Sequence, residues 1–383
     1  MTLGKHIEKI RLSKILPAVV VCLLFTNVIF LVLFLNEHDR NKRVVSTAPM
    51  ASQETKVGPQ DVKPAPQEVK VAVAPPARSV EKAPDASAGK SAPPPAQSSV
   101  SAVAGIPAPF VSAEPGEYAL LCEKQTKQLR LYRVNTGNVF NLVKTYPCII
   151  GSNNGDKLRP GDFATPEGVY FFLRFIPGKS LPAQYGSGAF VLNYPNYLSR
   201  REGKKGNGIW LHGHYADKSI GKDILNTKGC IAVENGSLKE IESLVKPNST
   251  PIVITGQVKT INKEKQDVLA GELRQFLEAW RKSWESLNTK KYLSLYAPDF
   301  VSGQGMDYTA FKNHKEKVNK NKKFIKVAVE RPFMLMPPEY GGDVGVIRFT
   351  QKYVSDNFKS EGGKIFYVKK VKSKWQIFGE SMF

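Results

Sequence analysis

The chain has 383 residues and carries 55 Lys and Arg against 34 Asp and Glu, which gives a formal net charge of +21. Its hydrophobic content of 42% is enough to bury a core, and this excludes a wholly disordered chain. Four cysteines are too few for a disulfide-dense scaffold. The positive charge favours an anionic partner, such as nucleic acid, anionic lipid or a cell-wall polymer, without choosing among them.

The first feature along the chain is an apolar stretch at residues 15–35, which runs for 21 residues without a charged side chain. This length matches the roughly 20 residues that a helix needs to cross a bilayer. Residues 1–14 carry four basic side chains and one acidic one, and positive flanks stay in the cytoplasm. We therefore expect a cytoplasmic tail and an uncleaved signal anchor in the inner membrane, with the rest of the chain outside the cytoplasm. A cleaved signal peptide is the alternative, although its apolar region would be shorter, about 7–15 residues.

Residues 36–115 differ in composition from the rest of the chain. They hold 13 of the 26 prolines, together with many Ala, Ser, Gln and Lys residues. No helical or alternating apolar pattern is present, so the segment cannot bury enough surface to offset the entropy of ordering. We expect a disordered, partly extended linker.

Residues 116–257 are expected to form a β-rich domain, because short runs of β-branched and aromatic residues alternate with Gly, Pro, Asn and Asp. One helix is also indicated, with Ser237 as its N-cap and Glu240 completing a capping box. The expected strands are 118–122, 128–132, 145–150, 168–175, 189–193, 208–212 and 252–255.

Two short motifs in this domain carry chemistry. Cys230 follows Gly229 at the mouth of a turn, and His212 lies at the end of an apolar run. A cysteine is nucleophilic as its thiolate, and an imidazole is the usual base because its pKa lies near neutrality. Gly229 has no side chain, so its backbone can approach a substrate, and the amides around Cys230 could stabilise an oxyanion.

The blander interpretation is that Cys230 is structural. Of the three cysteines after residue 35, Cys122 and Cys148 lie in expected strands and are a candidate pair, which leaves Cys230 as an odd thiol. His212 and His214 would share one face of a strand, as in a zinc site, but no further cluster supplies the remaining ligands. We therefore expect no metal, with His214 lining the cleft or held structurally.

The order of these motifs resembles the L,D-transpeptidase catalytic domain of the YkuD family. The resemblance rests on His212-Gly213, on Cys230 eighteen positions later within Thr-x-Gly-Cys, on the stretch from Gly161 to Tyr170, and on the Gln128-Leu-x-Leu-Tyr132 strand. It implies a mostly β fold that cuts and joins peptidoglycan stem peptides through a cysteine acyl-enzyme, without a cofactor.

The resemblance also implies individual roles. Cys230 would be the nucleophile, His212 the base, and the carbonyl of Gly213 would orient the imidazole. The amides of Gly229 and Cys230 would form the oxyanion hole, and Thr227 would brace the turn.

Two neighbouring residues leave questions open. Many family members have Arg or Asn after Cys-Ile, whereas this chain has Ala232, which puts the choice of substrate in doubt. Lys228 could hold a thiolate or a substrate carboxylate, or it could be a solvated loop lysine.

Residues 264–383 form a second expected unit. Apolar residues recur at helical spacing from Leu269 to Leu287 and predict one long helix, with Trp280 and Trp284 in its core face. Helices followed by an antiparallel sheet resemble the NTF2-like fold, an α+β cone. Shorter helices are expected at 290–296 and 308–318, and strands at 324–329, 333–336, 344–353, 364–371 and 375–378.

A lysine-rich run near the third of these helices is expected to be a solvated face. Nucleic acid is a weaker alternative, because no aromatic residues interleave and no recognition motif is present. The run consists of Lys312, Lys315, Lys317, Lys320, Lys322, Lys323 and Lys326.

Three functions remain open from the sequence. The first is L,D-transpeptidation of peptidoglycan, and the second is L,D-carboxypeptidation, in which water resolves the same acyl-enzyme. The third is a non-catalytic wall-binding scaffold. The combination of the two domains resembles certain Gram-negative cell-shape enzymes, which implies a periplasmic location.

Overall fold

The computed structural model describes residues 105–383. The expected tail at 1–14, the expected membrane span at 15–35 and most of the expected linker lie outside this range. Within residues 105–383, no helix is both long enough and apolar enough to cross a membrane.

Eight strands of the first domain close into a barrel in the order β10-β3-β4-β5-β9-β8-β7-β6. The β8–β9 and β10–β3 ladders are parallel, and the other neighbours are antiparallel. The strands are β3 (Tyr118–Glu123), β4 (Gln128–Asn135), β5 (Val139–Ile149), β6 (Gly168–Pro177), β7 (Gly188–Leu192), β8 (Trp210–His212), β9 (Ile231–Val233) and β10 (Pro251–Thr255).

The apolar runs that the sequence shows arise because several of these strands are buried on both faces. In β3, Leu120 and Cys122 point into the barrel, whereas Ala119 and Leu121 belong to a second core outside it. Successive side chains of a strand point to opposite faces, so a strand with two covered faces reads as continuously apolar.

Short helices cover part of the barrel: α2 (Tyr197–Arg201), α3 (Asn235–Leu244) and the 3₁₀ turns η1 (Gly178–Ser180) and η2 (Ala183–Tyr185). Leu238 and Ile241 seat α3 on the barrel core. The expected N-cap at Ser237 is wrong, because the helix begins at Asn235 and its cap position is Glu234, three residues earlier. Glu240 forms an ion pair with Lys144 (2.6 Å) in place of a capping box.

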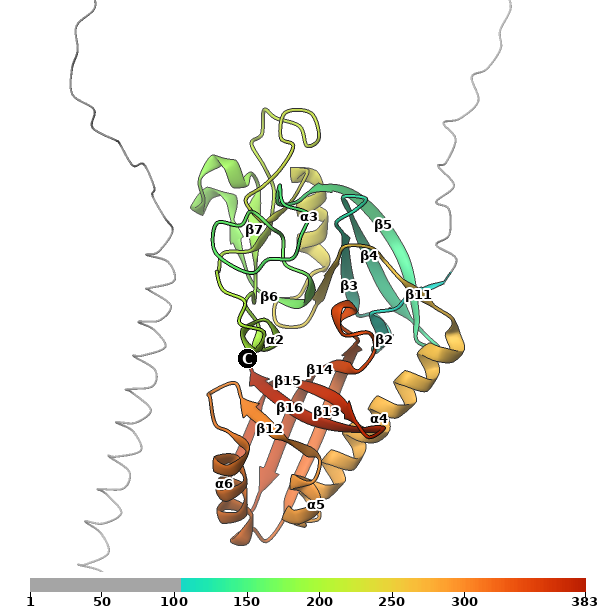
Figure 1. The fold of residues 1–383 in the computed structure, drawn as a ribbon, viewed down its shortest axis with the longest axis vertical. Helices are drawn as coiled ribbons and strands as arrows, with labels where there is room; N and C mark the ends of the chain where they lie inside the picture. The colour runs from blue at the N-terminus through green and yellow to red at the C-terminus, as the bar shows by residue number, and fades with distance from the viewer. Residues whose placement is uncertain (1–104) are drawn as a thin grey trace, which may run out of the picture. The chain divides into compact units, whose positions relative to one another are not determined.

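The second domain is a six-stranded sheet in the order β12-β16-β15-β14-β13-β2, with a long helix running along it (Figure 1). The helices are α4 (Lys263–Glu285), α5 (Thr289–Leu293) and α6 (Tyr308–Lys320), and η3 (Pro338–Tyr340) is a short turn. The strands are β12 (Tyr296–Ser302), β13 (Ile325–Leu335), β14 (Val344–Ser355), β15 (Lys359–Val371) and β16 (Lys374–Met382).

The three expected helices are present, although α5 ends at Leu293 and Tyr296 already belongs to β12, and the strands differ most at two places. The two strands expected at 324–329 and 333–336 are one strand, β13, interrupted by a bulge at which Arg331 adopts φ 51°. Strand β12 was not expected, because Pro298 and Asp299 resemble turn residues. It lies at the edge of the sheet, where a missing backbone donor is tolerated.

The core of the second domain contains both tryptophans, as expected, with Trp280 0% and Trp284 6% exposed. Two lysines approach the same aromatic cluster. Lys364 is buried with its Nζ 3.4 Å from Glu380, and Lys315 Nζ lies 4.6 Å from the Trp284 ring centre. Burial lowers the pKa of Lys315 to about 8. Lys315 is therefore an exception to the solvated face expected for the lysine run.

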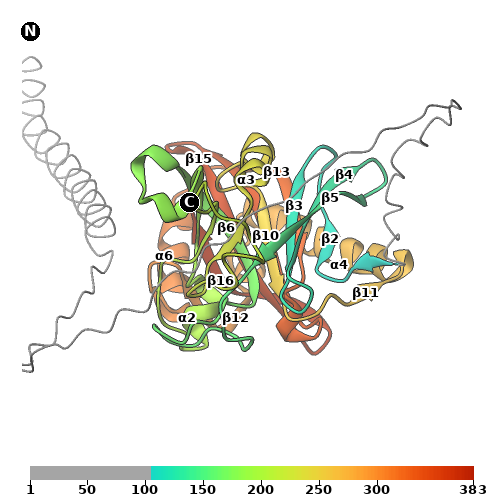
Figure 2. The same ribbon diagram turned by 90° about the horizontal axis from the view of Figure 1, so that it is seen from above.

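The segment that precedes the barrel is ordered and belongs to both domains. Strands β1 (Ile106–Pro107) and β2 (Phe110–Ser112) lie inside the expected linker, so the boundary at residue 115 is wrong. Strand β1 pairs with β11 (Thr260–Ile261), and β2 extends the sheet of the second domain beside α4 (Figure 2). Strands of two or three residues carry no detectable alternation, which is why the sequence did not indicate them.

A shared apolar core joins the two domains. Phe110 stacks on Phe140 of the barrel, with ring centres 5.0 Å apart, and Tyr197 of α2 stacks on Tyr367 of the sheet at 4.7 Å. The Tyr197 hydroxyl also donates to the Phe378 carbonyl (2.5 Å). The domains therefore share side chains from several elements of each.

We predict that Phe110→Ala destabilises the chain by about 3–5 kcal/mol, because it leaves a cavity in this shared core. Urea denaturation followed by fluorescence measures the loss. The matched control is Phe358→Ala, since Phe358 is 58% exposed and should change stability by less than about 0.5 kcal/mol. Equal effects of the two substitutions would contradict the assignment of Phe110 to the core.

Candidate active site

Two short parallel strands bring the predicted nucleophile and base to one place. His212 ends β8, and Cys230 directly precedes β9, with Leu211 paired to Ile231 and His212 to Ala232. Extending this register by one residue sets Trp210 opposite Cys230. Since paired residues project to one side and alternate residues share a face, Cys230 and His212 lie on the same face. The Cys230 thiol donates to the Gly208 carbonyl (3.4 Å).

The orientation of His212 is set by its own neighbour in sequence. Its Nδ1 lies 2.5 Å from the Gly213 carbonyl oxygen, and the imidazole is 8% exposed. A carbonyl can only accept a hydrogen bond, so Nδ1 carries the proton and Nε2 keeps its lone pair. The Tyr185 ring packs edge-on against the imidazole, with ring centres 5.0 Å apart, and it also packs against the Trp210 ring at 4.9 Å.

The turn that carries Cys230 is closed by a single hydroxyl. Thr227 Oγ1 donates to the Cys230 carbonyl (2.7 Å) and accepts from the Gly229 amide (3.1 Å). Gly229 adopts φ 123°, and a Cβ there would lie 2.7 Å from the Ala164 carbonyl oxygen. The residue must therefore be glycine, and its amide is already engaged within the turn. Lys228 is exposed at the tip.

His214 is held on both sides of its ring. Its Nε2 lies 2.8 Å from Glu234 Oε2, and its Nδ1 lies 2.8 Å from the Tyr215 carbonyl oxygen. The side chain is buried. Of the two roles left open for His214, this arrangement favours the structural one, because neither ring nitrogen is free. Across residues 105–383, no group of three or more His, Cys, Asp or Glu residues is arranged to hold a metal ion.

Burial shifts the pKa values of His212 and Cys230 in opposite directions. Desolvation lowers the pKa of His212 to about 4 and raises the pKa of the Cys230 thiol to about 11. Both shifts favour the uncharged forms of the imidazole and the thiol at neutral pH.

The positive charge near the thiol comes from a residue that the sequence did not single out. Lys157 is 4% exposed and pairs with Asp162 (2.7 Å). Its charge, together with the Trp210 amide, pulls the pKa of Cys230 downward against the effect of burial. Asp162 also accepts from the Leu158 and Arg159 amides, so its carboxylate closes the turn at residues 158–162.

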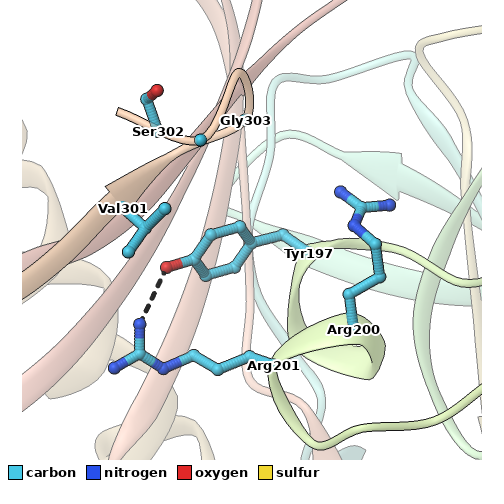
Figure 3. A pocket seen from close by; sticks show the side chains of 7 residues that line it. Tyr197, Arg200, Arg201, Val301, Ser302 and Gly303 are labelled. Carbon is cyan, nitrogen blue, oxygen red and sulfur yellow. Dashed lines mark hydrogen bonds between the residues drawn. The ribbon is translucent and has the colours of Figure 1, made fainter. Parts of the chain in front are cut away.

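A cavity of about 280 Å³ lies between α2 and β12 and is separate from this group (Figure 3). Figure 3 shows Arg201 reaching the Tyr197 hydroxyl, which also bonds to Phe378, and Arg201 forms an ion pair with Asp299. Tyr197 and Arg201 thus serve the contact between the domains. None of the predicted site residues lines this cavity.

Comparison with known proteins identifies both domains. Residues 117–254 match the family model of the YkuD L,D-transpeptidase catalytic domain, and residues 272–381 match that of the Cds6 C-terminal NTF2-like domain. The Escherichia coli K12 protein YafK, an L,D-transpeptidase by name, is 30% identical over 123 residues. This match covers 32% of the present chain and 44% of YafK, so it spans less than half of that curated relative.

Two solved structures are similar over most of the chain. Bd1075 of Bdellovibrio bacteriovorus is 28% identical with a TM-score of 0.60, covering 73% of this chain and 98% of its own. The helical cell shape determining protein Pgp2 of Campylobacter jejuni is 28% identical with a TM-score of 0.58, covering 72% and 94%. The chain therefore combines an L,D-transpeptidase catalytic domain of the YkuD family with a C-terminal NTF2-like domain.

Proposed function

We propose that this protein is a cysteine-dependent L,D-transpeptidase that acts on peptidoglycan stem peptides. The observation that supports it most strongly is the shared face of Cys230 and His212 on adjacent strands, with His212 Nδ1 committed to Gly213. The family of the catalytic domain supports the class of substrate.

The first half of the reaction follows from the protonation of the pair. The thiol turns from the Gly208 carbonyl toward His212, whose Nε2 takes the proton as the sulfur attacks the carbonyl preceding a terminal D-residue. The oxyanion would be stabilised by the Cys230 amide, since the Gly229 amide is engaged with Thr227. The C–N bond then breaks, the imidazolium protonates the leaving amine, and a thioester to Cys230 remains.

The second half decides between two products. In transpeptidation, an amine of a neighbouring stem attacks the thioester and releases the thiol. In L,D-carboxypeptidation, water does so and leaves a shortened stem. The second outcome is a serious alternative because Pgp2, a cell shape determining protein, is similar over both domains, and because Ala232 stands where many relatives have Arg or Asn.

We further propose that residues 15–35 anchor the protein in the inner membrane and that both folded domains act in the periplasm. The positive flank at 1–14 supports this orientation. The linker would then carry the catalytic domain toward the wall.

We predict that the full-length chain forms a covalent adduct with a carbapenem at Cys230, because the strained lactam carbonyl acylates the thiol. Intact-protein mass spectrometry with peptide mapping detects it. Cys230→Ala should abolish the adduct, while Cys122→Ala, which removes a buried thiol of the same barrel, should retain it. An unmodified wild-type protein would favour the scaffold function.

We predict different pH profiles for two reactions of the same sulfur. Alkylation by iodoacetamide needs free thiolate, so its rate should rise about tenfold per pH unit up to the thiol pKa of about 11. Acylation by the carbapenem uses neutral His212 as base, which is lost only as the pH falls through about 4. Its rate should be level from pH 5.5 to 8. A decline that begins near pH 6.5, as for an exposed histidine, would contradict the burial of the base.

We predict that incubation with tetrapeptide-bearing wall fragments yields cross-linked dimers, identified by chromatography and mass spectrometry. Cys230→Ala is the control and should yield none. Tripeptide monomers in place of dimers would show that water resolves the acyl-enzyme and would assign the protein as an L,D-carboxypeptidase.

A further inference from the structure

One side chain outside the predicted site joins the segments that surround His212. Asn235 is the first residue of α3, and its Nδ2 donates to the His214 carbonyl (2.9 Å). Its Oδ1 accepts from the His214 amide (3.3 Å) and from the Ser187 amide (2.8 Å). The side-chain amide of Asn235 thus binds the backbone N–H and C=O of His214, and also the backbone N–H of Ser187, which directly precedes β7.

The packing around this amide leaves no room for other side chains. A Cβ added at Gly213 would lie 2.1 Å from Asn235 Oδ1, and one added at Gly186 would lie 2.0 Å from it. Contacts this short exclude any side chain at either position while Asn235 is in place. The glycine that follows His212 therefore has a steric reason: it lets the Asn235 amide reach the backbone.

Both segments held by Asn235 contact the imidazole directly. The Gly213–His214 segment carries the Gly213 carbonyl, which accepts from His212 Nδ1. Gly186 and Ser187 follow Tyr185, whose ring packs edge-on against His212. Asn235 does not itself contact the imidazole in any hydrogen bond of the described structure.

We propose that Asn235 is a positioning residue of the active site: it fixes the Gly213 carbonyl and Tyr185, which both contact His212, and so aims Nε2 at Cys230. The expected effect of Asn235 on the reaction rate rests on the proposed function. The orientation of the His212 ring by Asn235 rests on the geometry alone. In enzymes that orient the base with a carboxylate, one side chain does this directly. Here a backbone carbonyl orients the ring, and a peptide group needs a second element to hold it.

Glu234, the preceding residue, supports the same segment from the side. Its carboxylate contacts His214 Nε2 (2.8 Å) through Oε2 and accepts from the Ile220 amide (3.0 Å) through Oε1. The His214 ring and the His214 backbone are thus held by consecutive residues at the start of α3. The start of the helix at Asn235, three residues earlier than an N-cap at Ser237 would give, places both side chains at this point.

The test uses the full-length chain with Asn235→Asp, which keeps the shape of the side chain but replaces the Nδ2 donor with an acceptor that repels the His214 carbonyl. Asn235→Ala is the second variant and removes all three bonds without adding charge. Carbapenem acylation is measured as a maximal rate and a half-saturating concentration, per mole of folded protein. We expect the maximal rate to fall about 10- to 100-fold in both variants with little change in the half-saturating concentration.

A readout independent of activity follows the Nδ1 proton of His212 by NMR. In the wild type this proton, bonded at 2.5 Å, should give a downfield signal protected from exchange, and the signal should disappear in both variants. The matched control is Asn196→Asp. Asn196 is also an asparagine at the start of a helix, and it is buried, with its Nδ2 bonded to the Val169 carbonyl (2.8 Å) and its Oδ1 to the Ser199 amide (2.9 Å). It should lower stability and leave the rate and the signal unchanged.

The outcomes separate the two proposals. An unreactive wild type with the expected NMR result would refute the proposed function and leave the positioning role supported. A reactive wild type whose Asn235 variants keep the rate and the Nδ1 signal would overturn the positioning role alone. Loss of the fold in both variants would also overturn it, because Asn235 would then hold the domain together and not the imidazole.

Discussion

The parallel pairing of β8 with β9 is the contact on which the rest of the site depends. Each of the two strands has three residues, and Cys230 follows His212 by eighteen positions in the sequence. The register of the strands nevertheless sets the side chains of His212 and Cys230 on one face. A shift of one residue would turn either side chain to the opposite face. The register is held at the Cys230 end by Thr227, and at the His212 end by the contacts of α3.

The chemistry of the pair depends on burial more than on charge. Desolvation keeps His212 neutral, which suits a base, and it also keeps the thiol protonated, which opposes nucleophilicity. The buried cation Lys157 offsets only part of this second effect. The arrangement is therefore consistent with proton transfer that accompanies attack, in which His212 matters through its direction. A base that acts by pointing at the thiol must be held rigidly. The Gly213 carbonyl holds the His212 ring only while its own peptide group is fixed.

The two domains are not independent modules. Strand β2 precedes the barrel in sequence but completes the sheet of the second domain, and Phe110 packs from there against the outside of the barrel. The outer faces of β3, β6 and β10 are covered by the sheet of the second domain, which is why those strands are apolar on both sides. The inner faces of the same strands form the barrel core that supports the active-site strands. The shared core and the barrel core are therefore formed by alternate residues of the same strands, so a substitution in the shared core acts directly on strands of the catalytic domain.

The sequence by itself determined the two classes of fold, and it supplied the prediction that Cys230 and His212 are the reacting groups. Cys230 after a glycine, His212-Gly213 at the end of an apolar run, and helical spacing from Leu269 to Leu287 are local patterns, and local patterns survive without knowledge of distant contacts. Only the tertiary structure showed the start of α3, the strands within residues 106–112, the packing of Lys315 against Trp284, the effect of Lys157 on the pKa of Cys230 and the hydrogen bonds of Asn235. Each of these depends on a partner far away in the chain: Phe140 for Phe110, the Trp284 ring for Lys315, and the His214 backbone for Asn235. A sequence does not show whether a polar side chain faces water or a buried peptide group. Its hydrogen-bond partner is known only from the folded structure.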